Sequence, residues 1–166
     1  MGEILSSIPA AQRALFQRYH IGGCSSCGYE AEDSLAKVCK DHNILDVNEV
    51  VTFLYEAHEL DQKMQLPPAE VKAMLDAGED FSFIDVRSGE ELDEGAFPAA
   101  EAMNYENSEQ YMSLPKDRKI VFACLEGDRA LNVCAYFRGH EFTNVFTLKG
   151  GIRAWKSDVD AAVLNG

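Results

Sequence analysis

The sequence lacks an apolar run long enough to cross a membrane. Its longer apolar stretches, such as residues 120–125, are far shorter than the roughly 20 residues that a spanning helix requires. Basic residues are also scarce, since 15 Lys and Arg stand against 28 Asp and Glu, for a net charge of −13 at pH 7. Nucleic acids and anionic membrane surfaces attract cationic proteins. We therefore expect no nucleic-acid partner and no membrane partner.

Residues 1–20 lack the order of a secretion signal, in which basic residues precede an apolar stretch. This absence predicts a cytoplasmic protein. Cysteine is sparse as well, with five residues in the chain. In a reducing compartment, thiols serve metal binding or redox chemistry more often than disulfides. We therefore expect the cysteines to act as chemical groups and not as crosslinks.

The first part of the chain shows only helical patterns. Apolar residues at helical spacing follow Pro9, and two further helical segments follow Asp33 and Asp46, which are typical capping residues. Asp46 and Glu49 also have the spacing of a capping box. We predict a small all-α domain over residues 1–60.

After a polar linker at residues 61–66, strand and helix patterns alternate. A helix is predicted from Pro67 to Gly78. The further elements are strands at 81–85, 119–123 and 144–148, and helices at 129–138 and 152–159. Such alternation predicts an α/β domain, over residues 66–166, in which helices cover both faces of a mostly parallel sheet.

Cys124 stands where an apolar strand gives way to a glycine-containing turn and then to a helix near Arg129. Backbone N–H groups of such a loop and the N-terminus of the helix both stabilise an anion, which favours the thiolate. A thiolate held in this way can attack a sulfur donor, and the same loop then holds the persulfide. Arg129 adds a fixed positive charge. The alternative is that Cys124 is a small apolar residue of the core.

Five sequence blocks in this second domain resemble the rhodanese family. They are residues 83–87, 90–100, 124–129, 139–145 and 148–155. The resemblance covers roughly residues 66–160 and implies a central parallel five-stranded sheet flanked by helices. It also implies a sulfurtransferase whose loop cysteine accepts sulfane sulfur as a persulfide and passes it to a thiol or another nucleophile.

The resemblance also implies roles for particular residues. Cys124 and Arg129 would be catalytic, and the loop amides that form the anion cradle would come from Leu125, Glu126, Gly127, Asp128 and Arg129. Related phosphatases and arsenate reductases have one residue more between the cysteine and the arginine. The shorter loop of this chain resembles the sulfur-transferring branch of the fold.

The partners implied are a small sulfur donor and a thiol acceptor, with a protein persulfide as an alternative donor. Carboxylates at Glu126 and Asp128 repel dianions, so a persulfide or polysulfide is favoured over thiosulfate. Asp85 and Arg87 follow a strand at the edge where sites form in open α/β sheets. We expect Asp85 to brace the loop and Arg87 to pair with Glu90 or Glu91, which lie in the next turn of the chain.

A second pair of thiols, Cys24 and Cys27, forms a CxxC element flanked by glycines. Three interpretations remain open: a dithiol that attacks a persulfide, half of a metal site, or idle loop residues. His20, Cys39 and His42 have the ligand types for zinc, and an iron–sulfur cluster is a further alternative. Cys39 shares a helical face with Leu35 and Val38, so burial in the core is favoured for it, as it is for Cys134 in the second domain.

Residues 19–59 resemble the small helical domains that accompany disulfide-reductase and hybrid-cluster proteins. A dithiol module beside a persulfide-forming module suggests a relay from Cys124 to Cys24 or Cys27. Two other classes remain open for the whole chain: a non-catalytic thiol or persulfide sensor, and a metal-binding module linked to redox or iron–sulfur metabolism.

Overall fold

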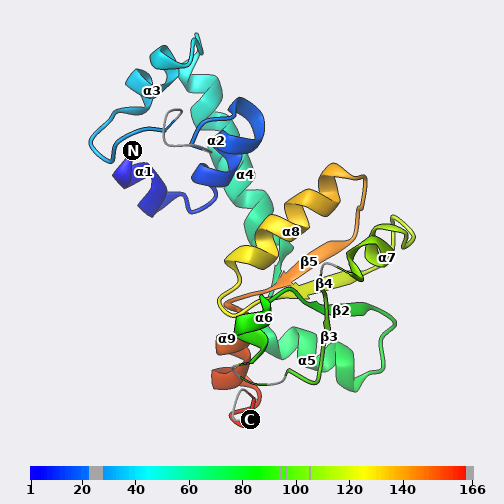
Figure 1. Cartoon of the computed structure of the whole chain (residues 1–166). Coiled ribbons are helices and arrows are strands. Elements are labelled where there is room, and N and C mark those ends of the chain that lie inside the picture. Colours follow the sequence, from blue (N-terminus) through cyan, green and yellow to red (C-terminus); the bar gives the residue numbers. More distant parts are fainter. Residues whose placement is uncertain (23–27, 94, 96, 105, 164–166) are drawn as a thin grey trace. The chain divides into compact units, whose positions relative to one another are not determined.

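The structure is a computed structural model, and it describes residues 1–22, 28–93, 95, 97–104 and 106–163. The chain divides into two compact units, Met1–Lys63 and Met64–Gly166. Helices make up the first unit and a sheet with helices makes up the second (Figure 1). Across the described residues, none of the helices combines the length and the hydropathy that a bilayer crossing requires.

The first unit is helical throughout its described secondary structure, as the apolar spacing predicted. Its helices are α1 (Gly2–Ser7), α2 (Ala11–Tyr19), α3 (Leu35–Asp41) and α4 (Val47–Met64). The apolar faces of these helices meet in one core, which includes the fully buried Leu15, Ile21 and Val50. The short helix α1 was not predicted.

The caps of two helices differ in part from the prediction. Ser34, and not Asp33, caps α3, because its hydroxyl accepts a hydrogen bond from the N–H of Lys37 at 3.2 Å. Both residues are good caps, so the sequence alone does not choose between them. Asp46 caps α4 as predicted and accepts from the N–H of Glu49 at 3.2 Å.

The predicted linker at residues 61–66 is wrong. Its first four residues complete α4, and Gln65 and Leu66 form the first strand of the sheet. Asp61 is buried, at 7% exposure, and pairs with Arg13 of α2. The polarity that suggested a linker thus belongs in part to an ion pair between two helices, and in part to the exposed Gln62 and Lys63 of α4.

The second unit is a five-stranded parallel sheet with helices, as the resemblance implied. Its strands are β1 (Gln65–Leu66), β2 (Ser82–Asp85), β3 (Glu101–Ala102), β4 (Ile120–Ala123) and β5 (Val145–Leu148). They lie in the order β1-β5-β4-β2-β3, and every neighbouring pair is parallel. The helices are α5 (Pro68–Asp76), α6 (Gly89–Leu92), α7 (Ser108–Met112), α8 (Asp128–Gly139) and α9 (Gly151–Asp158).

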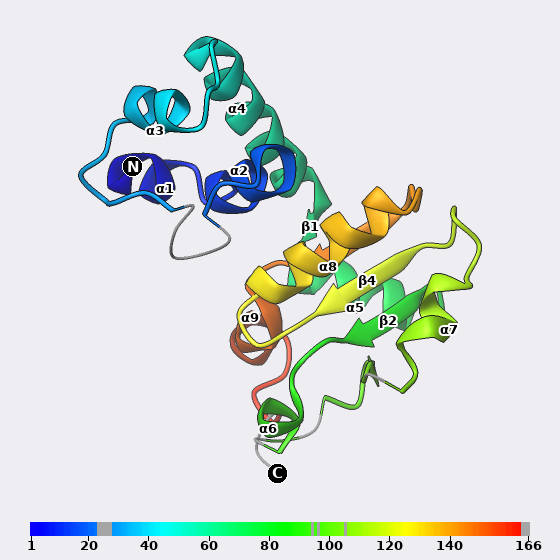
Figure 2. The same ribbon diagram turned by 45° about the horizontal axis from the view of Figure 1, so that its top comes forward.

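Strand β4 lies at the centre of the sheet and is buried on both faces. Side chains alternate along a strand, so Val121 and Ala123 pack with residues of α5 and α9, while Ile120 and Phe122 pack with residues of α8. Figure 2 shows α8 on one face of the sheet and α5 and α9 on the other. The residue after β4 therefore stands at the carboxyl edge of a sheet covered on both sides.

Candidate active site

Cys124 follows β4 directly and lies at the bottom of the loop that leads into α8. The residue is buried, at 4% exposure. Its Sγ accepts hydrogen bonds from the N–H of Gly127, at 3.1 Å, and from the N–H of Ala130, at 3.4 Å. Gly127 has a φ of 104°, a left-handed conformation that favours glycine. The turn thereby directs backbone N–H groups at the sulfur.

The outer side of the same loop is held by the first turn of α9. The N–H of Ile152 donates to the carbonyl of Cys124 at 2.9 Å, and the N–H of Arg153 donates to the carbonyl of Leu125 at 3.1 Å. Gly151 permits this approach, because a Cβ there would lie 2.4 Å from the Cys124 carbonyl oxygen. With its carbonyls fixed outward, the loop presents its N–H groups inward. We call these two hydrogen bonds the α9 clamp.

The N–H groups that donate to Sγ differ in part from the predicted set of loop amides. Gly127 lies within the predicted set from Leu125 to Arg129, whereas Ala130 lies one residue beyond it. The cause is that α8 begins at Asp128, so Ala130 still has a free N–H in the first turn of the helix. Hydrogen bonds from these donors and the helix dipole both stabilise negative charge on Sγ.

Arg129 reaches from α8 to the segment that follows β2. Its Nη1 pairs with the carboxylate of Glu91 and donates to the carbonyl of Val86 at 3.3 Å. The hydrogen bond to Glu91 is the largest cause of a raised pKa of Arg129, and the nearby Cys124 adds a smaller contribution. The positive charge at the end of the loop is thus present, and it is shared with a carboxylate.

Glu91 is a site residue that sequence reasoning placed in another role. Its carboxylate also accepts from the N–H of Ser88 at 2.7 Å, which completes a capping box at the start of α6. Arg129 first, and then Ser88, lower the pKa of Glu91 from 4.5 to about 2. The spacing from Ser88 to Glu91 is the signal in the sequence that would have found this box.

The two acidic side chains of the loop are not equivalent. Glu126 pairs with Arg153 of α9, so its charge is compensated. Asp128 is exposed in the first turn of α8, where a negative charge is favourable. The expected repulsion by two acids is therefore weaker than the sequence suggested, and Asp128 carries most of it.

Asp85 and Arg87 form a buried pair beside the loop. The Nε of Arg87 donates to Asp85 at 2.9 Å, and the side chains are 2% and 0% exposed. Arg87 also donates to the backbone carbonyls of Glu91, at 2.9 Å, and of Gly95, at 3.0 Å. The predicted partner of Arg87, a carboxylate of Glu90 or Glu91, is therefore wrong. Asp85 is nearer along the chain, and it also accepts from the N–H of Arg87 at 3.0 Å.

The remaining cysteines divide into two groups. Cys134 is fully buried in α8 and donates to the carbonyl of Phe146 at 3.1 Å. Cys39 is 1% exposed in the core of the first unit, and burial raises the pKa of its thiol. Cys24 and Cys27 lie outside the described residues, and so does every metal site built on them.

Within the described residues, no three side chains of His, Cys, Asp or Glu form a group that could hold a metal ion. His42 is the C-cap of α3, three residues after Cys39 in the chain, and it is partly buried. The zinc and iron–sulfur alternatives thus depend on Cys24 and Cys27.

Fold and loop together define a domain class, a parallel α/β domain in which backbone N–H groups donate to a cysteine after the central strand. The rhodanese-like domain family matches residues 67–158 of this chain. The chain belongs to the rhodanese-like family.

Two named relatives are similar to about half of the chain. A putative sulfurtransferase, YtwF, of Bacillus subtilis is 35% identical over 95 residues, which are 57% of this chain and 91% of the relative. A sulfurtransferase of Allochromatium vinosum is 36% identical over 78 residues, which are 46% of this chain and 73% of the relative.

A solved structure, that of reduced CoADR-RHD from Bacillus anthracis, superposes with a TM-score of 0.51 at 20% identity. It covers 69% of this chain and 20% of that protein. This likeness supports the fold.

Proposed function

We propose that this chain is a sulfurtransferase in which Cys124 carries sulfane sulfur as a persulfide. One observation carries the proposal: two backbone N–H groups at the start of α8 donate to Sγ of Cys124 at the carboxyl edge of the sheet. A hydrogen-bonded sulfur at a helix N-terminus has the character of a nucleophile. The sulfurtransferase names of two similar proteins support the proposal.

The chemistry requires two steps on one sulfur atom. The thiolate of Cys124 attacks the outer sulfur of a persulfide, R–S–S⁻. The S–S bond of the donor breaks, R–S⁻ leaves, and Cys124 becomes a persulfide. A thiolate acceptor then attacks the terminal sulfur, and the thiolate of Cys124 leaves. The N–H groups of Gly127 and Ala130 hold negative charge in the loop before and after each transfer.

Charge around the loop favours a persulfide over thiosulfate. Near the loop, Arg129 and Arg153 are paired with Glu91 and Glu126, and Asp128 adds a further carboxylate. Two cations against three carboxylates leave these five groups with a net negative charge. A dianion is repelled more strongly than a monoanion by the same field. We infer that the donor is an organic persulfide or polysulfide.

The test is sulfur loading followed by turnover. The protein is treated with an organic persulfide or with thiosulfate, and mass spectrometry locates the added sulfur. Turnover to a thiol acceptor is then measured with both donors. We expect one added sulfur on Cys124, catalytic cycling, and a higher kcat/KM for the persulfide than for thiosulfate.

Two variants make the test specific. Cys124→Ser is expected to lose loading and turnover. Cys134→Ser is the matched control, because Cys134 lies in the same unit and its replacement retains a donor toward the carbonyl of Phe146. Loading of Cys124 without turnover would contradict the proposal that the chain is an enzyme, and it would favour a persulfide sensor.

A further inference from the structure

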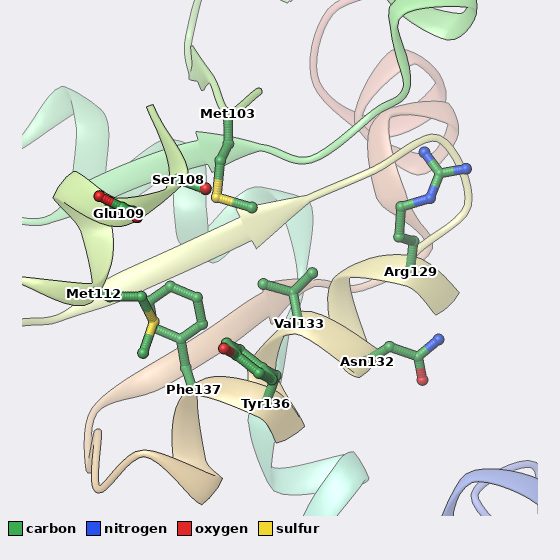
Figure 3. A pocket seen from close by; sticks show the side chains of 9 residues that line it. All are labelled: Met103, Ser108, Glu109, Met112, Arg129, Asn132, Val133, Tyr136 and Phe137. Atoms are coloured by element: carbon green, nitrogen blue, oxygen red, sulfur yellow. The ribbon is translucent and has the colours of Figure 1, made fainter. Parts of the chain in front are cut away.

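A groove lies between α7 and α8, on the face of the sheet that α8 covers. It encloses about 430 Å³, a volume in the range of small-molecule sites. Figure 3 shows the side chains that line it, with Met103 and Val133 facing each other across the groove. Met112 and Phe137 lie toward one end, and Arg129 marks the other.

The middle of this groove is apolar. Met103, Met112 and Val133 are partly buried, Phe137 is buried, and the ring of Tyr136 is 56% exposed. Methionine side chains are flexible and polarizable, so they adapt to ligands of varied shape. Binding of an apolar group that displaces water from a groove with this lining lowers the free energy of the system.

The groove adjoins the reacting loop at Arg129. Met103, Met112, Val133 and Phe137 belong to the same packed cluster as Cys124. Arg129 lines the groove and is also the last residue of the loop. The next residue, Ala130, donates its N–H to Sγ. A molecule in the groove therefore lies beside the loop at the end marked by Arg129.

We propose that this groove binds the apolar group R of an organic thiol substrate, R–SH, and of its persulfide. This inference rests on the proposed function. In the transfer step, R–S⁻ attacks the terminal sulfur of the Cys124 persulfide, a new R–S–SH forms, and the thiolate of Cys124 leaves. The reverse step uses the same contacts, so one groove serves donor and acceptor.

Charge selects a neutral R group. Glu109 is exposed at the wall of the groove, and the chain as a whole carries a net charge of −13. Thiols with several carboxylates are repelled by this field, whereas alkyl and aryl groups are not. Glutathione is therefore expected to be a weaker substrate than a neutral thiol with an apolar group of similar length.

The kinetic test uses acceptors of increasing chain length. Cys124 is loaded with sulfur, and its transfer to ethanethiol, butanethiol and hexanethiol is followed as a second-order rate constant. Each methylene that is fully buried is expected to raise the constant about four-fold. Equal rates for the three thiols would contradict binding of R in the groove and would leave the proposed function intact. Absence of transfer to every acceptor would instead contradict the proposed function.

Polar replacements of nearly equal size test the location. Met103→Gln with Val133→Thr is expected to flatten the dependence on chain length, because the polar lining lowers the rate with hexanethiol more than the rate with ethanethiol. Val159→Thr is the matched control, because Val159 is also partly buried but packs with the cluster on the other face of the sheet. A chain-length dependence unchanged in the double variant would contradict the assignment.

A binding measurement does not depend on activity. In Cys124→Ser protein with labelled methionine methyl groups, hexanethiol is expected to shift the NMR signals of Met103 and Met112. Met74, which packs on the other face of the sheet, is the internal control. Equal shifts at all methionines, or none, would overturn the site even if the variants failed to fold.

Discussion

The carboxylate of Glu91 joins two parts of the site. It caps α6 through Ser88 and neutralises part of the charge of Arg129. Neither contact involves Cys124, yet together they fix where the guanidinium at the end of the loop lies. Glu91 is thus a positioning residue, and its own titration gives a test of that role.

Glu91→Gln is expected to destabilise the protein by about 1 kcal/mol at neutral pH. Gln retains the capping hydrogen bond, so the loss reports the charge. Because the folded-state pKa is lowered from 4.5 to about 2, the stabilisation is complete above about pH 4.5 and is lost as the pH falls toward 2. The difference in unfolding free energy between wild type and variant should shrink over that interval in denaturant titrations.

The control for this prediction is Glu90→Gln, which changes an exposed carboxylate in the same turn. It is expected to have little effect at any pH. A difference between Glu91→Gln and wild type that stays constant from pH 6 to pH 2 would contradict the pairing with Arg129.

For single residues, the sequence predicts where a side chain lies along the chain better than it predicts which groups that side chain contacts. The apolar strand and the glycine turn identify Cys124, because they require only local pattern. The partner of Arg87 was missed since three carboxylates lie within reach along the chain, and only the buried geometry selects Asp85. Ala130 was missed because its role follows from the residue at which α8 begins.

Among the elements, α9 has an effect on the loop that its place in the sequence does not indicate. Gly151 has a φ of 64°, and a Cβ there would also lie 2.5 Å from the carbonyl oxygen of Leu125. Gly151→Ala is expected to displace the loop and to lower sulfur loading of Cys124 by about ten-fold or more, because misplaced reacting groups are costly. Mass spectrometry of the loaded protein measures this loss.

Gly78→Ala is the control that distinguishes backbone strain from the steric clash expected in Gly151→Ala. Gly78 also has a φ of 64°, but a Cβ there would meet nothing within 4 Å. The variant is expected to cost about 1–2 kcal/mol of stability and to load sulfur as wild type does. Equal loading by both alanine variants would show that the α9 clamp does not shape the loop.

The long elements were predictable and the short ones were not. Strands β2, β4 and β5 are apolar runs beside turn signals, and their predicted ranges agree with the structure to within a residue. Strands β1 and β3 have two residues each, too few to show alternation. Their hydrogen bonds come from neighbours far along the chain, as where the N–H of Lys149 donates to the carbonyl of Leu66 at 2.9 Å.

At the scale of the whole molecule, the alternation of strands and helices was sufficient to predict the class of fold. The groove was not predictable, because Met103, Met112 and Val133 come from three separate segments. Only the completed sheet brings them together. Local sequence patterns thus predict the strands and helices that form the layers. A groove between these elements can be found only once the folded structure is known.

The relay hypothesis belongs to this scale, since it joins the two units. It predicts that Cys24→Ser with Cys27→Ser slows the release of sulfur from the Cys124 persulfide. A tethered thiol acts at an effective concentration on the order of 1 mM, so the loss should be large with dilute external thiol and vanish well above that concentration. Sulfide release measured against thiol concentration provides the test.

The control is Ser25→Ala with Ser26→Ala, which changes the same segment without removing a thiol. It should release sulfide at the wild-type rate. If the double cysteine variant also does so with dilute acceptor, there is no transfer between Cys124 and the CxxC pair.

The dependence of the loop on α9 has a consequence for synthesis on the ribosome. Cys124 emerges before Ile152 and Arg153, whose N–H groups hold the carbonyls of the loop. A nascent chain therefore exposes this thiol before the helix that holds its loop has been made. Oxidants that meet the growing polypeptide encounter an ordinary thiol at this position.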